Sequence, residues 1–349
     1  MFSALRSRAG SGRRHPRTLW PALAAALGIV LTSCTFAGSA ETDAAATTPA
    51  PGGSRGSDDR VYVTNQQDNT VSVIDAHTNK VVNTVKTGKA PEGVAVTPDG
   101  RHVYIADNGS AQVSVLNTRS NKITKTVPVE KSPTGVSISP DGTSLYVANG
   151  GSNNISVIDT GTDRVTASIP VGKSPVSVTF SHDGNTAYVA NSGSGTLSVI
   201  NTRTRQVTGN LPAGRSPVGV AVTPDGKSAY VADEVAARVV AVETRTRKTT
   251  QVAVGEGPFD VAIGPDGKSV YTAVLGPGEV SVIDTAGNRV SSTIPVGSTG
   301  TDPFNIEVTS QAVYVTEQAA GALTVIDPTS HKVLATVTVG NSPYGVAVS

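Results

Sequence analysis

Residue types that crosslink a chain or bind metal are scarce in this sequence. Only one of the 349 residues is Cys, which excludes a disulfide framework, a thiolate zinc site and an iron–sulfur cluster. Aromatic residues make up 4% of the chain and charged residues 16%. A core must therefore be built mainly from Val, Ile, Ala and Leu, which suit the pleated surface of a sheet. Gly (36) and Pro (21) are frequent, and they indicate many turns.

The N-terminal segment has the features of an export signal. Five arginines and no acid precede an apolar run over residues 19–31, which is too short to span a bilayer. Thr32 and Ser33 then precede Cys34 in a pattern that resembles the cleavage box of bacterial lipoproteins, where the cysteine receives a diacylglycerol. The sequence predicts a lipoprotein-type signal peptide over residues 1–33 and a lipid anchor at Cys34, on the extracytoplasmic face of the cell membrane. An ordinary signal peptide with an incidental thiol is the alternative.

Removal of residues 1–33 changes the charge of the protein. The whole chain has 28 Lys and Arg against 27 Asp and Glu; the loss of five arginines leaves 23 against 27, a net charge of −4. A mildly acidic domain lacks the overall basic character of a nucleic-acid-binding protein. Residues 34–58 are rich in Ala, Thr, Gly, Ser and Pro. This composition predicts a flexible tether between the lipidated Cys34 and a folded domain over residues 59–349.

A repeat of about 42 residues organises residues 59–349. Tyrosines recur at intervals of 41 to 43 residues, at Tyr62, Tyr104, Tyr146, Tyr188, Tyr230, Tyr271 and Tyr314. In the first unit, apolar residues alternate with small or polar ones over residues 61–65, 71–75, 80–85 and 93–96, and turn residues separate these segments. The alternation predicts four short strands in each unit and no helix.

Four short antiparallel strands in each repeat of 40–45 residues are typical of a blade of a β-propeller. Seven tyrosines predict seven blades in an all-β fold. The chain ends on a strand, residues 345–348, of the kind that precedes the tyrosine strand in every other unit. We therefore expect this strand to pair with residues 61–64 and to close the ring, which removes the exposed sheet edges.

The repeats resemble a known family. Tyr-Val-Thr-Asn at residues 62–65, its variants at residues 146–149 and 188–191, and the recurring Pro-Asp-Gly turns are similar to the YVTN-repeat (YncE-like) seven-bladed propellers of bacteria and archaea. The resemblance covers residues 59–349 and implies the propeller fold. The resemblance does not imply one function, because such relatives include surface-layer, periplasmic and redox-associated proteins and at least one reported to bind DNA.

The order of the strands predicts where a site lies. We name the strands of a blade A (innermost), B (the tyrosine strand), C and D (outermost). In an antiparallel meander the D–A and B–C loops share one face, here called the D–A face, and the A–B and C–D turns share the opposite A–B face. By analogy with other propellers, we expect a ligand at the mouth, which is the end of the central channel on the D–A face.

The repeats differ from one another at this mouth. Three blades carry aromatic residues directly after the proline that begins strand A, and polar residues flank them. The predicted ligand-binding residues are Glu92, Phe259, Asp260, Phe304, Asn305, Glu317 and Tyr344. Aromatic rings with carboxylates suit a sugar, a cationic group or a peptide side chain. The alternative is that the three aromatic residues only plug the channel.

The opposite sector of the D–A face is basic. Four successive blades carry a cation at the same loop position, Lys89, Lys131, Lys173 and Arg215, which form an arc for an anionic partner such as single-stranded nucleic acid. No stacking aromatic residues interleave with this basic arc, and the net charge after removal of the signal is negative. Both features favour an ordinary solvated rim over nucleic-acid binding.

The sequence gives little support for catalysis. The histidines His77, His102, His182 and His331 lie on turns of the A–B face and lack the spacing of a metal site, so we predict no metal or other cofactor. The alternative function is a lactonase-like or other hydrolytic enzyme, in which Asp260 acts with Glu92 or Glu317 as an acid/base pair. The main prediction is an exported, lipid-anchored, monomeric propeller of the cell envelope that binds an unknown protein, glycan or small molecule.

Overall fold

The computed structural model describes residues 59–297 and 300–349, which belong to one compact unit, Arg55–Ser349. The predicted signal peptide, Cys34 and tether lie outside the described residues. Within the described residues, no helix is long and apolar enough to cross a membrane.

Twenty-eight strands form seven four-stranded antiparallel sheets, each of which is one blade. The first blade consists of β28 (Pro343–Val348), β1 (Arg60–Asn65), β2 (Thr70–Asp75) and β3 (Lys80–Lys86). The second consists of β4 (Pro91–Val96), β5 (His102–Asp107), β6 (Gln112–Asn117) and β7 (Lys122–Pro128). The third consists of β8 (Pro133–Ile138), β9 (Ser144–Asn149), β10 (Asn154–Asp159) and β11 (Arg164–Pro170).

The remaining four blades repeat this order. The fourth consists of β12 (Pro175–Phe180), β13 (Thr186–Asn191), β14 (Thr196–Asn201) and β15 (Gln206–Pro212). The fifth consists of β16 (Pro217–Val222), β17 (Ser228–Asp233), β18 (Arg238–Glu243) and β19 (Thr249–Ala253). The sixth consists of β20 (Pro258–Ile263), β21 (Ser269–Val274), β22 (Glu279–Asp284) and β23 (Arg289–Pro295). The seventh consists of β24 (Pro303–Val308), β25 (Val313–Glu317), β26 (Ala322–Ile326) and β27 (Val333–Thr338).

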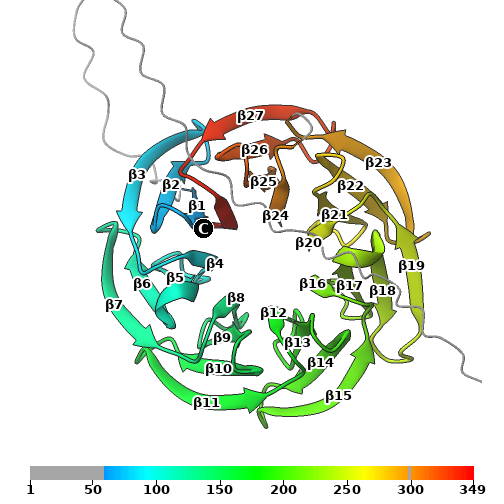
Figure 1. Cartoon of the computed structure of the whole chain (residues 1–349), viewed down its shortest axis with the longest axis horizontal. Helices are drawn as coiled ribbons and strands as arrows, with labels where there is room; N and C mark the ends of the chain where they lie inside the picture. Colours follow the sequence, from blue (N-terminus) through cyan, green and yellow to red (C-terminus); the bar gives the residue numbers. More distant parts are fainter. Residues whose placement is uncertain (1–58, 298–299) are drawn as a thin grey trace, which may run out of the picture. The chain divides into compact units, whose positions relative to one another are not determined.

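The blades form a closed ring around a central channel (Figure 1). Strand β28 pairs antiparallel with β1, so that Val348 lies opposite Val61 and Val346 opposite Val63. This pairing confirms the predicted closure of a seven-bladed propeller. Short helical turns, η1 (Asn108–Ser110) and η2 (Glu234–Ala236), are the two helical segments of the described residues.

The core lies between neighbouring blades, where β-branched residues of strands B and C pack together. The repeated tyrosines are buried, with at most 6% of each side chain exposed. Tyr104 also donates a hydrogen bond from its hydroxyl to Oδ1 of Asp163 in the next blade, at 2.7 Å. The repeated tyrosine therefore fills the core of each blade, and in some blades its hydroxyl also bonds to the next blade.

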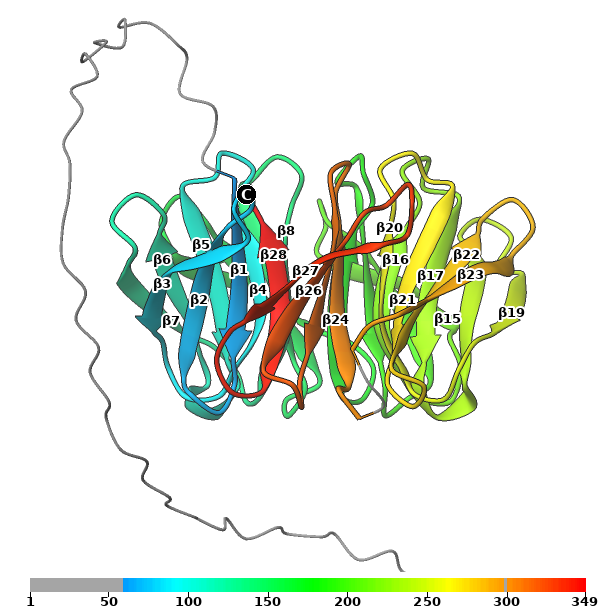
Figure 2. The same ribbon diagram turned by 90° about the horizontal axis from the view of Figure 1, so that it is seen from above.

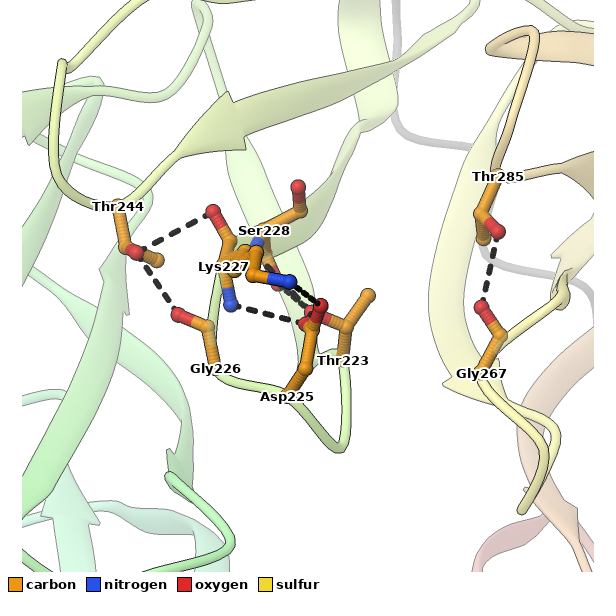
Figure 3. Close-up of polar contacts among 8 residues, drawn as sticks. All are labelled: Thr223, Asp225, Gly226, Lys227, Ser228, Thr244, Gly267 and Thr285. Atoms are coloured by element: carbon orange, nitrogen blue, oxygen red, sulfur yellow. Dashed lines mark hydrogen bonds and ion pairs between the residues drawn. The ribbon is translucent and has the colours of Figure 1, made fainter.

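The Pro-Asp-Gly turns are built alike on the A–B face (Figure 3). Asp225 accepts hydrogen bonds from the Thr223 hydroxyl at 2.7 Å and from the backbone N–H of Lys227 at 3.0 Å. Gly226 has a φ of +69°, which favours glycine, and its carbonyl accepts a bond from the Thr244 hydroxyl at 2.7 Å. The Thr223 hydroxyl and the Lys227 N–H hold the pKa of Asp225 at about 2. These aspartates therefore stabilise turns.

The side view separates the two faces of the ring (Figure 2). The first and last described residues, Asp59 and Ser349, lie on the A–B face, because β1 begins there and β28 ends there. Strand β23 ends and strand β24 begins on the opposite D–A face. Every inner strand (β4, β8, β12, β16, β20, β24 and β28) is an edge strand of its own sheet, so one edge of its backbone faces the channel.

Candidate functional site

Three of the predicted site residues form an aromatic cluster at the mouth. Phe259, Phe304 and Tyr344 are each the second residue of an inner strand, on β20, β24 and β28. The rings of Phe259 and Phe304 stack with centroids 3.6 Å apart, and Tyr344 meets Phe304 edge-on at 4.7 Å. Phe304 is 8% exposed, whereas Phe259 and Tyr344 are half-buried. The cluster covers one sector of the D–A end of the channel, where Phe259 and Tyr344 are partly exposed.

Glu92 lies beside this aromatic cluster and is buried. It is the second residue of β4, and its Oε1 accepts a hydrogen bond from Nε2 of Gln66 at 3.0 Å. Burial raises its pKa to about 7. Burial also raises the pKa of Tyr344 above its ordinary value, and the negative charges of Glu92, Asp260 and Glu234 raise it further. Tyr344 therefore sits in a region of negative potential that Glu92 helps to create.

Glu234 is a residue of this region that the sequence analysis missed. It belongs to η2 in the B–C loop of the fifth blade, and its negative charge acts on Tyr344. The first residues of the other B–C loops are neutral, for example Asn108 and Ser192. An alignment of the seven B–C loops identifies Glu234, because it is the one acidic residue at the first position.

Asp260 and Asn305 lie deeper, directly below the aromatic cluster. The Asn305 Nδ2 donates to Oδ2 of Asp260 at 2.6 Å, and the Asn305 Oδ1 accepts from the N–H of Val346 at 3.0 Å. These bonds link the inner strands β20, β24 and β28. At the same position, four other blades have glycine: a side chain at Gly93 would collide with the carbonyl oxygen of Thr134 in the next blade. Hydrogen bonds of the Asp260 and Asn305 side chains therefore link the inner strands in this sector, whereas elsewhere glycine lets the backbones of neighbouring inner strands approach closely.

The inner strands enclose a cavity of about 330 Å³ that contains a carboxylate not predicted from the sequence. Glu307, the fifth residue of β24, lines this cavity together with Asp260. The other six blades have a small residue at this position: Ala95, Ser137, Thr179, Ala221, Ala262 and Ala347. Burial raises the pKa of Asp260 to about 7, and burial and then the charge of Asp260 raise the pKa of Glu307 to about 7.

Glu317 is placed differently from the rest of the predicted site. It is the last residue of β25, is 1% exposed, and accepts a hydrogen bond from the Thr324 hydroxyl. In other blades a polar residue at the same position holds the D–A loop: Asn65 accepts from the N–H of Gly340 at 3.0 Å, and Asp233 from the N–H of Arg215 at 2.9 Å. The structure does not bring Glu317 into the aromatic cluster, because its carboxylate lies inside the blade.

The basic arc lies on the same face as the aromatic cluster, over the second to fifth blades. Lys89, Lys131, Lys173 and Arg215 are all exposed, and none forms an ion pair with another described residue. The remaining sector carries Asp68, Glu256 and Asp302 on its loops. Glu130, next to Lys131, is an acid within the basic sector. The D–A face is therefore predominantly basic on one side and predominantly acidic on the other.

The histidines lie away from the mouth. Three belong to turns of the A–B face, and His102 begins β5 at the same end. Among residues 59–297 and 300–349, no group of three or more His, Cys, Asp or Glu is arranged to hold a metal ion. The polar groups at the mouth and in the channel are carboxylates, amides and hydroxyls.

Comparisons with known proteins identify the fold more clearly than the activity. A family model described as a domain of unknown function, DUF5074, matches residues 57–218. A 38-residue stretch is 58% identical to the PE-PGRS family protein PE_PGRS18 of Mycobacterium tuberculosis (strain ATCC 25618 / H37Rv), and it covers 11% of this chain and 8% of that protein. The chain thus spans a small part of that relative.

Three solved structures share the architecture. A chain of Kuenenia stuttgartiensis hydrazine synthase has a TM-score of 0.70 and 26% identity, over 77% of this chain and 92% of that one. A functionally unknown protein from Desulfotomaculum acetoxidans DSM 771 has a TM-score of 0.69 and 16% identity, over 83% and 98%. The dihydro-heme d1 dehydrogenase NirN in complex with DHE has a TM-score of 0.64 and 15% identity, over 82% and 74%.

Proposed function

We propose that this protein is an exported, lipid-anchored binding module of the cell envelope, and that the mouth on the D–A face recognises a cationic group of a partner. The export signal and the anchor at Cys34 are inferred from residues 1–34. The ligand class is inferred from the chemistry of the mouth, where an aromatic surface adjoins carboxylates.

The observation that carries this proposal is the aromatic cluster in one sector of a repetitive ring. The second position of the inner strand is Thr134, Val176 or Val218 in three blades, so the fold does not require an aromatic residue there. A cation over an aromatic face gains about 0.5–2 kcal/mol, and nearby carboxylates add to the attraction. Tyr344 offers a half-buried ring among three negative charges. This combination suits a Lys or Arg side chain or another ammonium group.

The topology supports a role facing away from the membrane. The described chain begins on the A–B face at Asp59, opposite the mouth (Figure 2). Residues 35–58 can span at most about 86 Å when fully extended, at about 3.3–3.6 Å per residue. If Cys34 anchors the protein, the chain joins the ring on the side opposite the mouth. The D–A face is then available to a partner beyond the membrane surface.

A hydrolytic enzyme is the second candidate. One observation favours it: the carboxylate of Asp260, with a pKa of about 7, is oriented by Asn305 beside a cavity, as a general acid or base requires. Two of the structural neighbours are named as enzymes, a synthase and a dehydrogenase. Turnover of an ester or lactone panel that is lost in Asp260→Asn would favour this candidate over a binding module.

The test uses the chain from Arg55, the compact unit whose seven blades close on themselves. A peptide array rich in Lys, Arg and methylated Lys and an oligosaccharide array are screened, and hits are measured by calorimetry. Phe259→Val with Tyr344→Val, which introduces the residue of two sibling blades, is expected to weaken binding about tenfold or more. Phe180→Ile, which removes an aromatic residue that packs on Tyr146 away from the mouth, is the matched control.

Each outcome distinguishes the candidates. Binding of cationic probes that is lost in the double variant and kept in the control supports the proposal. Equal binding by all variants, or no binding of cationic probes, overturns it. Binding of single-stranded nucleic acid that weakens with salt and is lost on neutralising Lys89, Lys131, Lys173 and Arg215 would assign the basic arc a function instead.

A further inference from the structure

The central channel carries negative charge that no residue of its lining neutralises. Asp260 and Glu307 project from the adjacent strands β20 and β24 into the cavity of about 330 Å³. The residues that line this cavity include no Lys, Arg or His. Enclosing two carboxylates without a cation is unfavourable, because the low-dielectric surroundings disfavour the charged forms and strengthen their repulsion. The fold does not require this arrangement, since alanine occupies the Glu307 position in four blades.

The two carboxylates differ in their partners. Asp260 is held in place by the side chain of Asn305 and by the N–H of Ile306, at 2.6 and 3.3 Å. Glu307 is only partly exposed, and its carboxylate accepts no hydrogen bond from any residue in 59–297 or 300–349. A carboxylate that lines a cavity without a protein partner is uncommon, because polar groups removed from bulk water are generally hydrogen-bonded. Glu307 therefore has unused acceptor capacity in the cavity.

Hydroxyl groups occupy the opposite wall of the channel. Ser137 on β8 and Ser177 and Thr179 on β12 line the same cavity. The strands β8 and β12 lie across the ring from β20 and β24 (Figure 1). Within the described part of the chain, these three hydroxyls make no side-chain hydrogen bond. The cavity is thus anionic on one wall and carries free hydroxyl groups on the other.

We propose that the channel binds a small protonated amine that carries hydroxyl groups, an amino alcohol or amino sugar, with its ammonium group at Glu307 and Asp260. The ammonium supplies the missing positive charge and donates hydrogen bonds to both carboxylates, and the ligand hydroxyls meet Ser137, Ser177 and Thr179. A metal ion fits less well, because no third carboxylate or imidazole joins the pair. A cavity of this volume is in the lower range of small-ligand sites.

This channel site shares Asp260 with the mouth but does not include the aromatic cluster. The cavity is lined by the third to sixth residues of the inner strands, and none of the three rings of the aromatic cluster belongs to its lining. The lining extends to Val222, Ile263 and Val308, which end their strands on the A–B face. We therefore expect the amine to enter from that face, and the channel site does not depend on the function proposed for the mouth.

The experiment compares matched charged and neutral probes by calorimetry on the chain from Arg55. The pairs are glucosamine against glucose and ethanolamine against ethylene glycol, and CaCl2 is a separate probe. We expect binding of the amine and none of its neutral partner. Glu307→Gln should lower the affinity for the amine by about tenfold or more, which corresponds to about 1.4 kcal/mol. Glu307→Ala, which restores the residue of four sibling blades, is a second variant expected to fold.

The matched control is Glu243→Gln, which removes one negative charge from the exposed end of β18 and leaves the channel intact. Proton release provides a second readout, obtained by repeating the titration in buffers of different ionisation enthalpy. An amine that displaces protons from the channel carboxylates releases them in the wild-type protein, and it releases fewer in Glu307→Gln. Equal affinity of wild type and both Glu307 variants, binding of the neutral probes, or binding of Ca²⁺ alone would each overturn the proposal.

Discussion

The substitution Glu307→Gln should stabilise the propeller at high pH and leave its stability unchanged at low pH. Gln has nearly the shape of protonated Glu but cannot ionise. Burial and the charge of Asp260 raise the pKa of Glu307 from 4.5 to about 7 in the folded protein. Because the folded pKa lies above the unfolded one, the wild type keeps its full stability below the unfolded pKa. It loses stability as the pH rises through the folded pKa.

The size of this effect follows from the shift. Each pKa unit corresponds to about 1.4 kcal/mol, so a rise from 4.5 to about 7 gives at most about 3 kcal/mol. Glu307 keeps some solvent contact in the channel, which screens its charge and reduces the expected difference to about 2 kcal/mol. The variant also relieves repulsion on Asp260, and this contributes in the same direction. We therefore expect Glu307→Gln to be more stable than wild type by about 2 kcal/mol above pH 7.5.

The assay is urea unfolding followed by circular dichroism, at pH values between about 4.5 and 8.5 where the ionisation state of Glu307 changes. The chain from Arg55 has no Trp, since Trp20 is the only one, so circular dichroism replaces indole fluorescence. Other titrating groups largely cancel in the difference between variant and wild type. A difference that stays flat across this pH range, or a variant that is less stable at high pH, would refute the burial of an ionised Glu307.

Three further changes, two of them with matched control substitutions, test the fold. Gly93→Ala should destabilise the protein by about 2 kcal/mol or more in urea unfolding, because the added Cβ would collide with a backbone carbonyl of the next blade. The control Gly161→Ala has room for a Cβ and should change the stability little. Tyr104→Phe should cost about 1 kcal/mol in the same assay by removing the bond to Asp163, and Tyr146→Phe, whose hydroxyl makes no bond within the described chain, should be nearly neutral. Deletion of residues 343–349 leaves the edge of β1 unpaired and should promote aggregation, measured by light scattering.

The architecture is predictable from the sequence because each blade repeats the same physical solution. A tyrosine that fills the core between blades recurs every 41 to 43 residues. A Pro-Asp-Gly turn follows four of the seven inner strands, and His-Asp-Gly follows a fifth. Because the same pattern of strands and turns occurs in every unit, it predicts the blade more strongly than one copy would. The closure by β28 followed from counting, since the last strand was of the type that the first blade lacked.

The site is less predictable because contacts across the ring decide it. Glu317 is an acidic residue at the D–A end of a strand, which makes it a candidate from the sequence. In the structure its carboxylate lies inside the blade and accepts a hydrogen bond from the Thr324 hydroxyl. In other blades the last residue of strand B accepts a hydrogen bond from the backbone of the D–A loop. The sequence alone does not show this contact. Glu307 was overlooked because it lies within a strand, although a comparison with the small residues of its siblings marks it as exceptional.

The substitutions that the fold does not need are concentrated on three neighbouring inner strands. At β20 and β24, Asp260 and Asn305 replace glycine and must be satisfied by a chain of hydrogen bonds that reaches Val346 of β28. The residue before each of them is aromatic, so each strand presents a ring to the mouth and a polar group to the channel. The fold does not require these residues, since four other blades have glycine where Asp260 and Asn305 stand, and two have valine at the aromatic position. The asymmetry therefore argues for recognition in this sector, with the aromatic cluster as the boundary between a site at the mouth and a site in the channel.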